Sequence, residues 1–208
     1  MQRPDEKKRR QIAATAARLF ASRPFHKVKL DDVAAEAGVG KGTLYVYFKS
    51  KEDLYFWLIH DAFSQMVARL QEQLAGERIP AAQTLRRIIA ELVKFGFDNP
   101  QLFELVRVAG PKVRDPRWEV KRKELMSLIE ATIHRGNIGG EFDDPHPDVT
   151  ALCLPGMMRS VMLFGPRGLD RDTVTAQITR LVERGVCGSG GRTKRRRDVA
   201  VVAGRNGG

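Results

Sequence analysis

The sequence predicts an all-α protein with a helix-turn-helix near its N-terminus. Apolar residues recur at three- and four-residue steps along most of the 208 residues, which is the spacing of one face of an α-helix. Two short helical segments, at about 30–37 and 41–48, are separated by a turn that contains Gly38. Two short helices joined by a glycine-containing turn are typical of a helix-turn-helix.

The first three helices are indicated by short apolar stripes and by the residues that end them. The first is expected from about Asp5 to Ala21, with acidic residues in its first turn, where the helix dipole favours negative charge. The second ends at Gly38, which tolerates the left-handed conformation of a helix C-terminus. Val39 is expected to be the buried pin of the turn, and Leu44 and Phe48 to be core residues of the third helix.

Longer amphipathic helices follow. Ser50 is expected to cap a fourth helix that runs to about Leu74. Further helical segments are expected at about 79–98, 101–109, 115–135, 148–165 and 171–186. The long segment before Gly136 opens with an aspartate cap and a proline in its first turn, and Pro155 is expected to kink the helix that contains it.

The positive charge is concentrated at the two ends of the chain. The formal net charge is +11, of which residues 1–60 carry +5, residues 61–187 carry +1 and residues 188–208 carry +5. A basic head and tail around a neutral middle fit a nucleic-acid-binding head, with a different role for the middle. No secretory signal and no apolar run of about 20 residues is present, which favours a cytoplasmic protein without a membrane partner.

Several kinds of chemistry are disfavoured. Cys153 and Cys187 have no CxxC spacing, and the four histidines lack the spacing of metal ligands, so neither a metal nor a cofactor is expected. No nucleophile, paired carboxylates or phosphate-binding loop indicates catalysis. An enzyme or carrier that uses the helical middle, and a DNA-coating protein without sequence preference, remain as alternatives to a sequence-specific DNA-binding protein.

The run LDDVAAEAGVGKGTLYVYFKSKEDL, from Leu30 to Leu54, resembles the DNA-binding signature of the TetR family of one-component transcriptional regulators. The resemblance extends over about 50 residues, from the first helix to the start of the fourth. It implies an N-terminal three-helix DNA-binding domain at 1–50 and a C-terminal helical domain at 51–187 for effector binding and dimerisation. A basic tail at 188–208 is expected to be disordered.

The resemblance also implies what the protein does. We expect a homodimeric, ligand-responsive repressor that binds a palindromic double-stranded DNA operator and is released by a small apolar or amphipathic effector. The positions expected at the DNA are Lys29, Gly40, Lys41, Gly42, Thr43, Tyr45, Val46, Tyr47, Ser50 and Lys51. Three of them depart from the usual family residue: Lys29 and Gly40 lack the capping hydroxyl, and Val46 replaces a frequent histidine.

The two other expected sites lie in the helical middle. An effector pocket is expected at Phe63, Phe95, Phe103, Trp118, Met126 and Met158, although aromatic and methionine residues at helical spacing are more often plain core residues. A ligand carboxylate has Arg107, Arg122 or His134 as alternative partners. By resemblance, the last two helices form the dimer interface, with Met157, Val161, Met162, Val174, Ile178 and Leu181.

Overall fold

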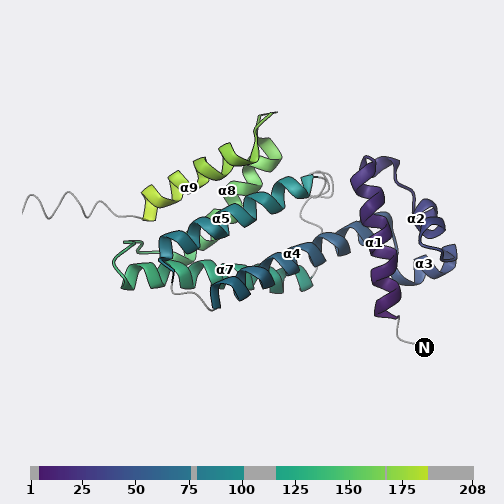
Figure 1. The fold of residues 1–208 in the computed structure, drawn as a ribbon, viewed down its shortest axis with the longest axis horizontal. Coiled ribbons are helices and arrows are strands. Elements are labelled where there is room, and N and C mark those ends of the chain that lie inside the picture. Colours follow the sequence, from purple (N-terminus) through teal and green to yellow (C-terminus); the bar gives the residue numbers. More distant parts are fainter. Residues whose placement is uncertain (1–4, 76–78, 101–115, 167, 187–208) are drawn as a thin grey trace, which may run out of the picture. The chain divides into compact units, whose positions relative to one another are not determined.

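A computed structural model of the chain describes residues 5–75, 79–100, 116–166 and 168–186. Within these ranges all regular structure is helical, which confirms the predicted fold class (Figure 1). The helices are α1 (Glu6–Ser22), the short 3₁₀ helix η1 (Phe25–Lys27), α2 (Leu30–Glu36), α3 (Lys41–Tyr47), α4 (Lys51–Ala75), α5 (Ala81–Asp98), α7 (Pro116–Ile138), α8 (Pro147–Phe164) and α9 (Arg171–Val186). The expected segment at 101–109 lies outside the described residues.

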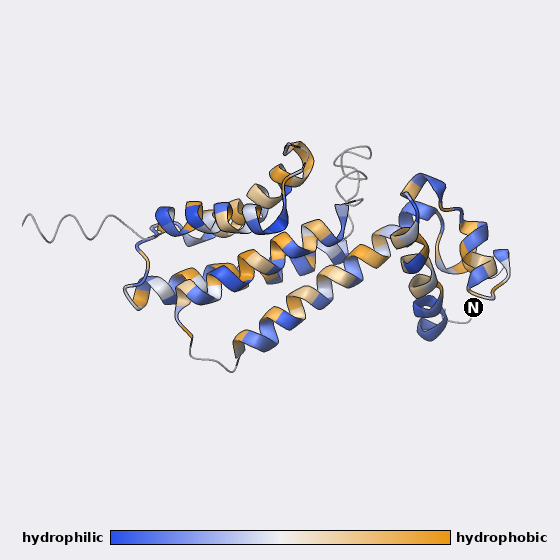
Figure 2. Cartoon of the chain, turned by 45° about the horizontal axis from the view of Figure 1, so that its top comes forward, coloured by the Kyte–Doolittle hydropathy of each residue, from blue (hydrophilic) through white to orange (hydrophobic). Residues whose placement is uncertain are grey.

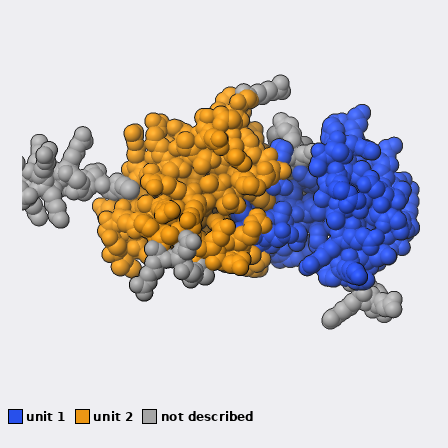
Figure 3. Space-filling view, in the orientation of Figure 1, with its two compact units in different colours: residues 1–66, 99–119 blue, residues 67–98, 120–208 orange. Residues whose placement is uncertain are grey.

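The chain divides into two compact units (Figure 3). The first unit comprises residues 1–66 and 99–119, and the second comprises residues 67–98 and 120–208. The helix-turn-helix therefore belongs to the first unit, and α5, α8 and α9 belong to the second. The expected domain boundary after residue 50 coincides with the start of α4 and stays a prediction.

The first unit is built on α1, which packs against α2, while α2 packs against α3. Asp5 caps α1 through its side chain, which accepts a hydrogen bond from the backbone N–H of Lys7 at 2.9 Å. The inward face of α1 carries large and small buried apolar residues, Ile12, Ala13, Ala16, Leu19 and Phe20. Small residues on this face allow the neighbouring helix to approach closely. Figure 2 shows the polar start of α1 and the apolar bands along the helices.

The turn between α2 and α3 follows the expectation at Gly38, whose φ of 64° is in the left-handed region. Its neighbour Val39 is half-buried rather than the buried pin that was expected. The turn is held in addition by Gln11 of α1, whose Nε2 donates to the backbone oxygen of Ala37 at 3.1 Å. The spacing of apolar residues does not predict this hydrogen bond between α1 and the turn.

The second unit is centred on α5, which packs against both α8 and α9. The buried residues of α5 follow one face: Ala81, Thr84, Leu85, Ile88, Ile89, Leu92, Val93, Phe95 and Gly96. At Gly96 an added Cβ would lie 2.9 Å from the sulfur of Met158, so the glycine permits the close approach of α8. Pro155 lies inside α8, which continues on both sides of it.

The expected end of α7 before Gly136 is wrong, because the helix continues to Ile138. Gly136 is buried, and an added Cβ would overlap the ring of Phe142. It is therefore a contact point inside the helix rather than a helix terminator. The left-handed residue comes later, at Gly140 with a φ of 72°.

The loop after α7 caps α5. The carboxylate of Glu141 accepts hydrogen bonds from the backbone N–H groups of Ala81 at 2.9 Å and Ala82 at 3.0 Å. These bonds lower the pKa of Glu141 below its usual value, because they stabilise the charged form. Glu141 thus satisfies the free N–H groups at the start of the central helix of the second unit.

Within the described ranges, no helix combines the length and apolar character needed to cross a bilayer.

Candidate nucleic-acid interface

Helix α3 separates its side chains into a buried set and an exposed set. Leu44 and Phe48 are 0% and 1% exposed, as expected for core residues. Tyr45 is 47% exposed and Val46 is 68% exposed. The other exposed positions of the helix start are Gly40, Lys41, Gly42 and Thr43. The arrangement presents an ammonium, a hydroxyl, an aromatic ring and an apolar side chain on one short helix, which suits contacts to phosphates and base edges.

Lys41, the first residue of α3, is paired with a carboxylate. Its Nζ lies 2.7 Å from Oδ2 of Asp31 in the first turn of α2. The hydrogen bond to Asp31 and its negative charge raise the pKa of the Lys41 ammonium. Both side chains are more than half exposed, so the pair is open to solvent and to an approaching phosphate. Sequence reasoning missed Asp31, since residues ten apart on two helices share no helical spacing.

Tyr47 is half-buried at the end of α3. Its phenolic oxygen accepts a hydrogen bond from the backbone N–H of Asp5 at 3.2 Å. A phenol that accepts one hydrogen bond still carries its own O–H donor. Tyr47 therefore ties the start of α1 to α3 and retains a donor for a phosphate oxygen.

The start of α4 forms a reciprocal cap. The hydroxyl of Ser50 accepts a hydrogen bond from the N–H of Asp53 at 3.1 Å, and Asp53 accepts one from the N–H of Lys49 at 2.9 Å. The side chain of Lys51 reaches η1. Its Nζ donates to the backbone oxygen of Phe25 at 2.9 Å and lies 4.4 Å from the centre of the Phe25 ring. Ser50 and Lys51 thus shape the unit, and an ammonium with three donors retains capacity for a phosphate.

The two departures at helix starts have the expected local effect. Lys29 and Gly40 occupy the N-cap positions of α2 and α3, and neither makes a side-chain capping hydrogen bond. All ten positions expected at the DNA lie in the first unit, between residues 29 and 51. The structure therefore brings these side chains together in one compact unit.

The residues expected to line an effector pocket are divided between the units. In the first, Phe63 is 5% exposed and stacks on Trp118, with 4.5 Å between ring centres. In the second, Phe95 and Met158 are each 7% exposed and Met126 is half-buried. Phe103 and Arg107 lie outside the described residues. Arg122 is half-buried, whereas the His134 side chain is 58% exposed and lies 3.7 Å from Glu130.

The residues expected at a dimer interface differ in exposure. Val174 and Ile178 are each 3% exposed and belong to the core of the second unit in a single chain. Met157, Val161 and Met162 are half-buried, and Leu181 is 51% exposed. The same two helices also expose apolar side chains that sequence reasoning missed: Val149 at 51%, Leu152 at 58% and Phe164 at 77%.

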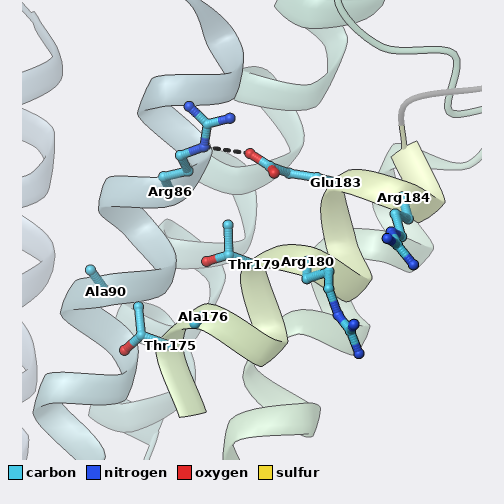
Figure 4. A pocket seen from close by; sticks show the side chains of 8 residues that line it. All are labelled: Arg86, Ala90, Thr175, Ala176, Thr179, Arg180, Glu183 and Arg184. Carbon is cyan, nitrogen blue, oxygen red and sulfur yellow. Dashed lines mark hydrogen bonds and ion pairs between the residues drawn. The ribbon is translucent and has the colours of Figure 1, made fainter. Parts of the chain in front are cut away.

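An open groove of about 710 Å³ lies between α5 and α9 in the second unit (Figure 4). Small side chains line part of it, namely Ala90, Thr175, Ala176 and Thr179. At its edge the guanidinium of Arg86 pairs with Glu183, which links the two helices across the groove. Among the described residues, no group of three or more histidine, cysteine or acidic side chains is arranged to hold a metal ion.

Comparison with known proteins gives matches over the first unit and over the fold. Residues 12–56 match the bacterial regulatory proteins of the tetR family. The chain is 32% identical over 81 residues to the fatty acid metabolism regulator protein of Bacillus subtilis (strain 168), a match covering 39% of this chain and 41% of that protein. The chain spans about half the length of the curated relatives it matches.

Solved structures match over most of the chain. A transcriptional regulator of the TetR/AcrR family from Thermobifida fusca YX-ER1 is 25% identical, with a TM-score of 0.73 that covers 86% of this chain and 98% of that one. The regulator FadR from Bacillus subtilis, solved in complex with stearoyl-CoA, is 18% identical, with a TM-score of 0.65 over 85% of this chain and 98% of that one. At 18% identity the second likeness concerns the fold alone.

Proposed function

The chain belongs to the TetR family of bacterial regulatory proteins, and on that premise we propose that it is a homodimeric regulator of transcription. It binds a palindromic DNA operator as a repressor in the bacterial cytoplasm, and a small apolar or amphipathic effector releases it. A ligand can do this only if it binds the DNA-free conformation more tightly than the DNA-bound one.

The observation that carries the proposal is the exposed face of α3. Buried Leu44 and Phe48 anchor the helix, while Thr43, Tyr45 and Val46 project from its exposed side. Thr43 can donate to a phosphate or base oxygen, and the exposed Val46 suits contact with a thymine methyl group. This combination of a fixed helix and a free polar and apolar face supports sequence reading in the major groove.

The proposed dimerisation is supported by the second unit, and the proposed effector binding by buried apolar residues of both units and by a similar structure. The apolar side chains exposed on α8 and α9, Leu152 and Leu181 among them, support a helical interface with a second copy. The buried methionine and aromatic residues of the helical region suit an apolar ligand. A similar structure carries stearoyl-CoA, an amphipathic molecule, in agreement with that ligand class.

Selection of random DNA duplexes by the purified full-length protein at physiological salt tests the proposal. The expected result is enrichment of an inverted repeat, whose half-sites are spaced by whole helical turns. A Thr43→Ala, Tyr45→Ala double variant should lose this preference and keep the helical circular dichroism of the parent, because both side chains are exposed.

Equal recovery of all duplexes would overturn the proposal in favour of a DNA-coating protein driven by the net charge of +11. That alternative predicts that deletion of the basic residues 188–208 abolishes binding. A sequence-reading regulator would lose affinity on this deletion but keep its preferred sequence.

A further inference from the structure

The side chain of His60 in α4 carries a buried nitrogen atom that makes no hydrogen bond within the described part of the chain. No described residue offers its Nε2 a hydrogen bond, although that nitrogen is shielded from solvent. The neighbouring hydroxyl of Ser64 bonds to the backbone oxygen of His60, at 2.7 Å, and not to the ring. A buried polar atom left without a hydrogen bond destabilises a protein, so such atoms are uncommon without a reason.

The position of His60 on α4 places it in an aromatic cluster. Phe56, His60 and Phe63 stand at steps of four and three residues, which brings them onto one face of the helix. Both phenylalanines contact Trp118 of α7, with ring centres 6.0 Å and 4.5 Å away. His60 therefore lies on the same helix face as two rings that contact one tryptophan, and all four residues belong to the first unit.

The nearby carboxylate of α4 is engaged elsewhere. Oδ2 of Asp61 accepts a hydrogen bond from Nε2 of Gln65 at 2.6 Å. Asp61 is the next residue to His60, so its side chain leaves the helix about 100° away. Asp61 therefore points away from the face that carries Phe56, His60 and Phe63.

We propose that this face binds a small ligand with an apolar body and a single oxygen head group, a carboxyl or a hydroxyl. The head group bonds to Nε2 of His60, and the body packs on Phe56, Phe63 and Trp118. A neutral imidazole nitrogen can donate to or accept from such an oxygen, depending on the tautomer. The inference rests on the proposed function only in treating this ligand as the effector.

A quaternary ammonium ligand makes different use of the same residues. Aromatic faces attract a cation directly, whereas a quaternary ammonium offers no hydrogen bond to Nε2. Decanoate, decan-1-ol and decyltrimethylammonium share one chain length and differ in head group. They are therefore matched probes, used at concentrations below those at which they form micelles.

The readout is the fluorescence of Trp118 in a full-length Trp57→Phe protein, since the chain holds two tryptophans. Decanoate or decan-1-ol should change this fluorescence with saturation. His60→Leu should weaken that binding about 3–10-fold, the effect of one lost hydrogen bond, and His60→Gln should weaken it less. The exposed His134→Leu is the control and should leave binding unchanged.

A second readout needs no ligand. His60→Leu removes the unpaired nitrogen, so the free protein should melt at the same temperature as the parent or higher. A clear loss of stability would show that the ring has a structural partner and would overturn the proposal. Binding of decyltrimethylammonium alone, insensitive to His60→Leu, would overturn it as well. Absence of binding by all three probes, in a protein that still selects an operator, would refute this site and leave the proposed function intact.

Discussion

The ammonium nitrogen of Lys41 lies 2.7 Å from Oδ2 of Asp31, so the first residue of α3 is held to the first turn of α2. Asp31→Asn would remove a negative charge from the surface proposed to face DNA and leave Lys41 free to contact phosphate. We expect about 3–10-fold tighter binding to the selected duplex at low salt, and a smaller gain at high salt. Fluorescence anisotropy at two salt concentrations measures both effects.

Asp32→Asn is the matched control for this charge change. Asp32 lies in the same turn and pairs with Arg23 at 3.8 Å rather than with Lys41. An equal gain in both variants would mean that general repulsion of DNA, and not the release of Lys41, is responsible.

Replacement of Lys51 by methionine should destabilise the first unit. The ammonium donates to the Phe25 backbone oxygen and lies over the Phe25 ring, and each contact is typically worth about 0.5–1 kcal/mol. We expect the free energy of unfolding, measured by denaturant titration, to fall by about 1 kcal/mol. Lys49→Met removes the same charge from an exposed side chain and should leave stability nearly unchanged. Equal stability of the two variants would contradict a structural role for Lys51.

Gly136→Ala should destabilise the second unit more than Gly96→Ala. An added methyl at Gly136 overlaps the rigid ring of Phe142, whereas at Gly96 it meets the flexible ends of Met158 and Met162. Overpacking of a core typically costs about 1–3 kcal/mol, and helix propensity returns up to about 1 kcal/mol. Gly185→Ala, with open space around it, reports the propensity gain alone. In thermal melts, Gly136→Ala should therefore be the least stable variant, Gly96→Ala intermediate and Gly185→Ala the most stable.

Glu141 should make the second unit sensitive to acid. The N–H groups of Ala82 and Ala81 lower its pKa. The contribution of this cap to the stability of the folded state is therefore complete above pH 4.5, the ordinary pKa of a glutamate. It is lost as the pH falls through the lowered pKa of the folded state. Glu141→Gln should melt below the parent at pH 7, and the difference should shrink as the pH drops below 4.5. A difference that stays constant down to pH 3 would exclude this linkage.

A glutamate in place of Leu152 should prevent dimerisation. Leu152 is 58% exposed on α8, and a charge buried at a helical interface between two copies would lack a partner. Sedimentation should then show a monomer, and operator affinity should fall because only one half-site is bound. Val120→Glu is the matched control, since Val120 is an equally exposed apolar residue of α7, at 56%. Dimers in both variants would place the interface elsewhere.

Local signals made most of the fold predictable. The helices of the first unit begin and end close to their expected residues because Asp5, Gly38 and Ser50 act through neighbours in the sequence. The expected helix end before Gly136 was wrong because the deciding contact comes from a residue outside the helix. Whether a glycine ends a helix or lies inside it depends here on Phe142, a ring that no periodicity connects to it.

The candidate sites could be predicted less completely, because their details depend on contacts between helices. The sequence indicated Lys41 and Lys51, but their partners Asp31 and Phe25 come from other elements. Val174 and Ile178 carry the apolar pattern of an interface, yet the same pattern serves the core of one chain. His60 gave no signal at all, since a lone histidine on an apolar stripe acquires meaning only through what surrounds it.

A second group of aromatic rings in the first unit, Phe20, Phe25 and Tyr55, gives the protein an intrinsic optical reporter. Phe20, Phe25 and Tyr55 lie with ring centres 4.9–5.5 Å apart, and they join α1, η1 and α4. Burial raises the pKa of Tyr55 to about 12, whereas a tyrosine in an unfolded chain ionises near pH 10. At a pH near 11, opening of the first unit would therefore ionise Tyr55 and add tyrosinate absorbance. Local unfolding of the first unit could be followed in this way without a label, separately from the tryptophan signals of α4 and α7.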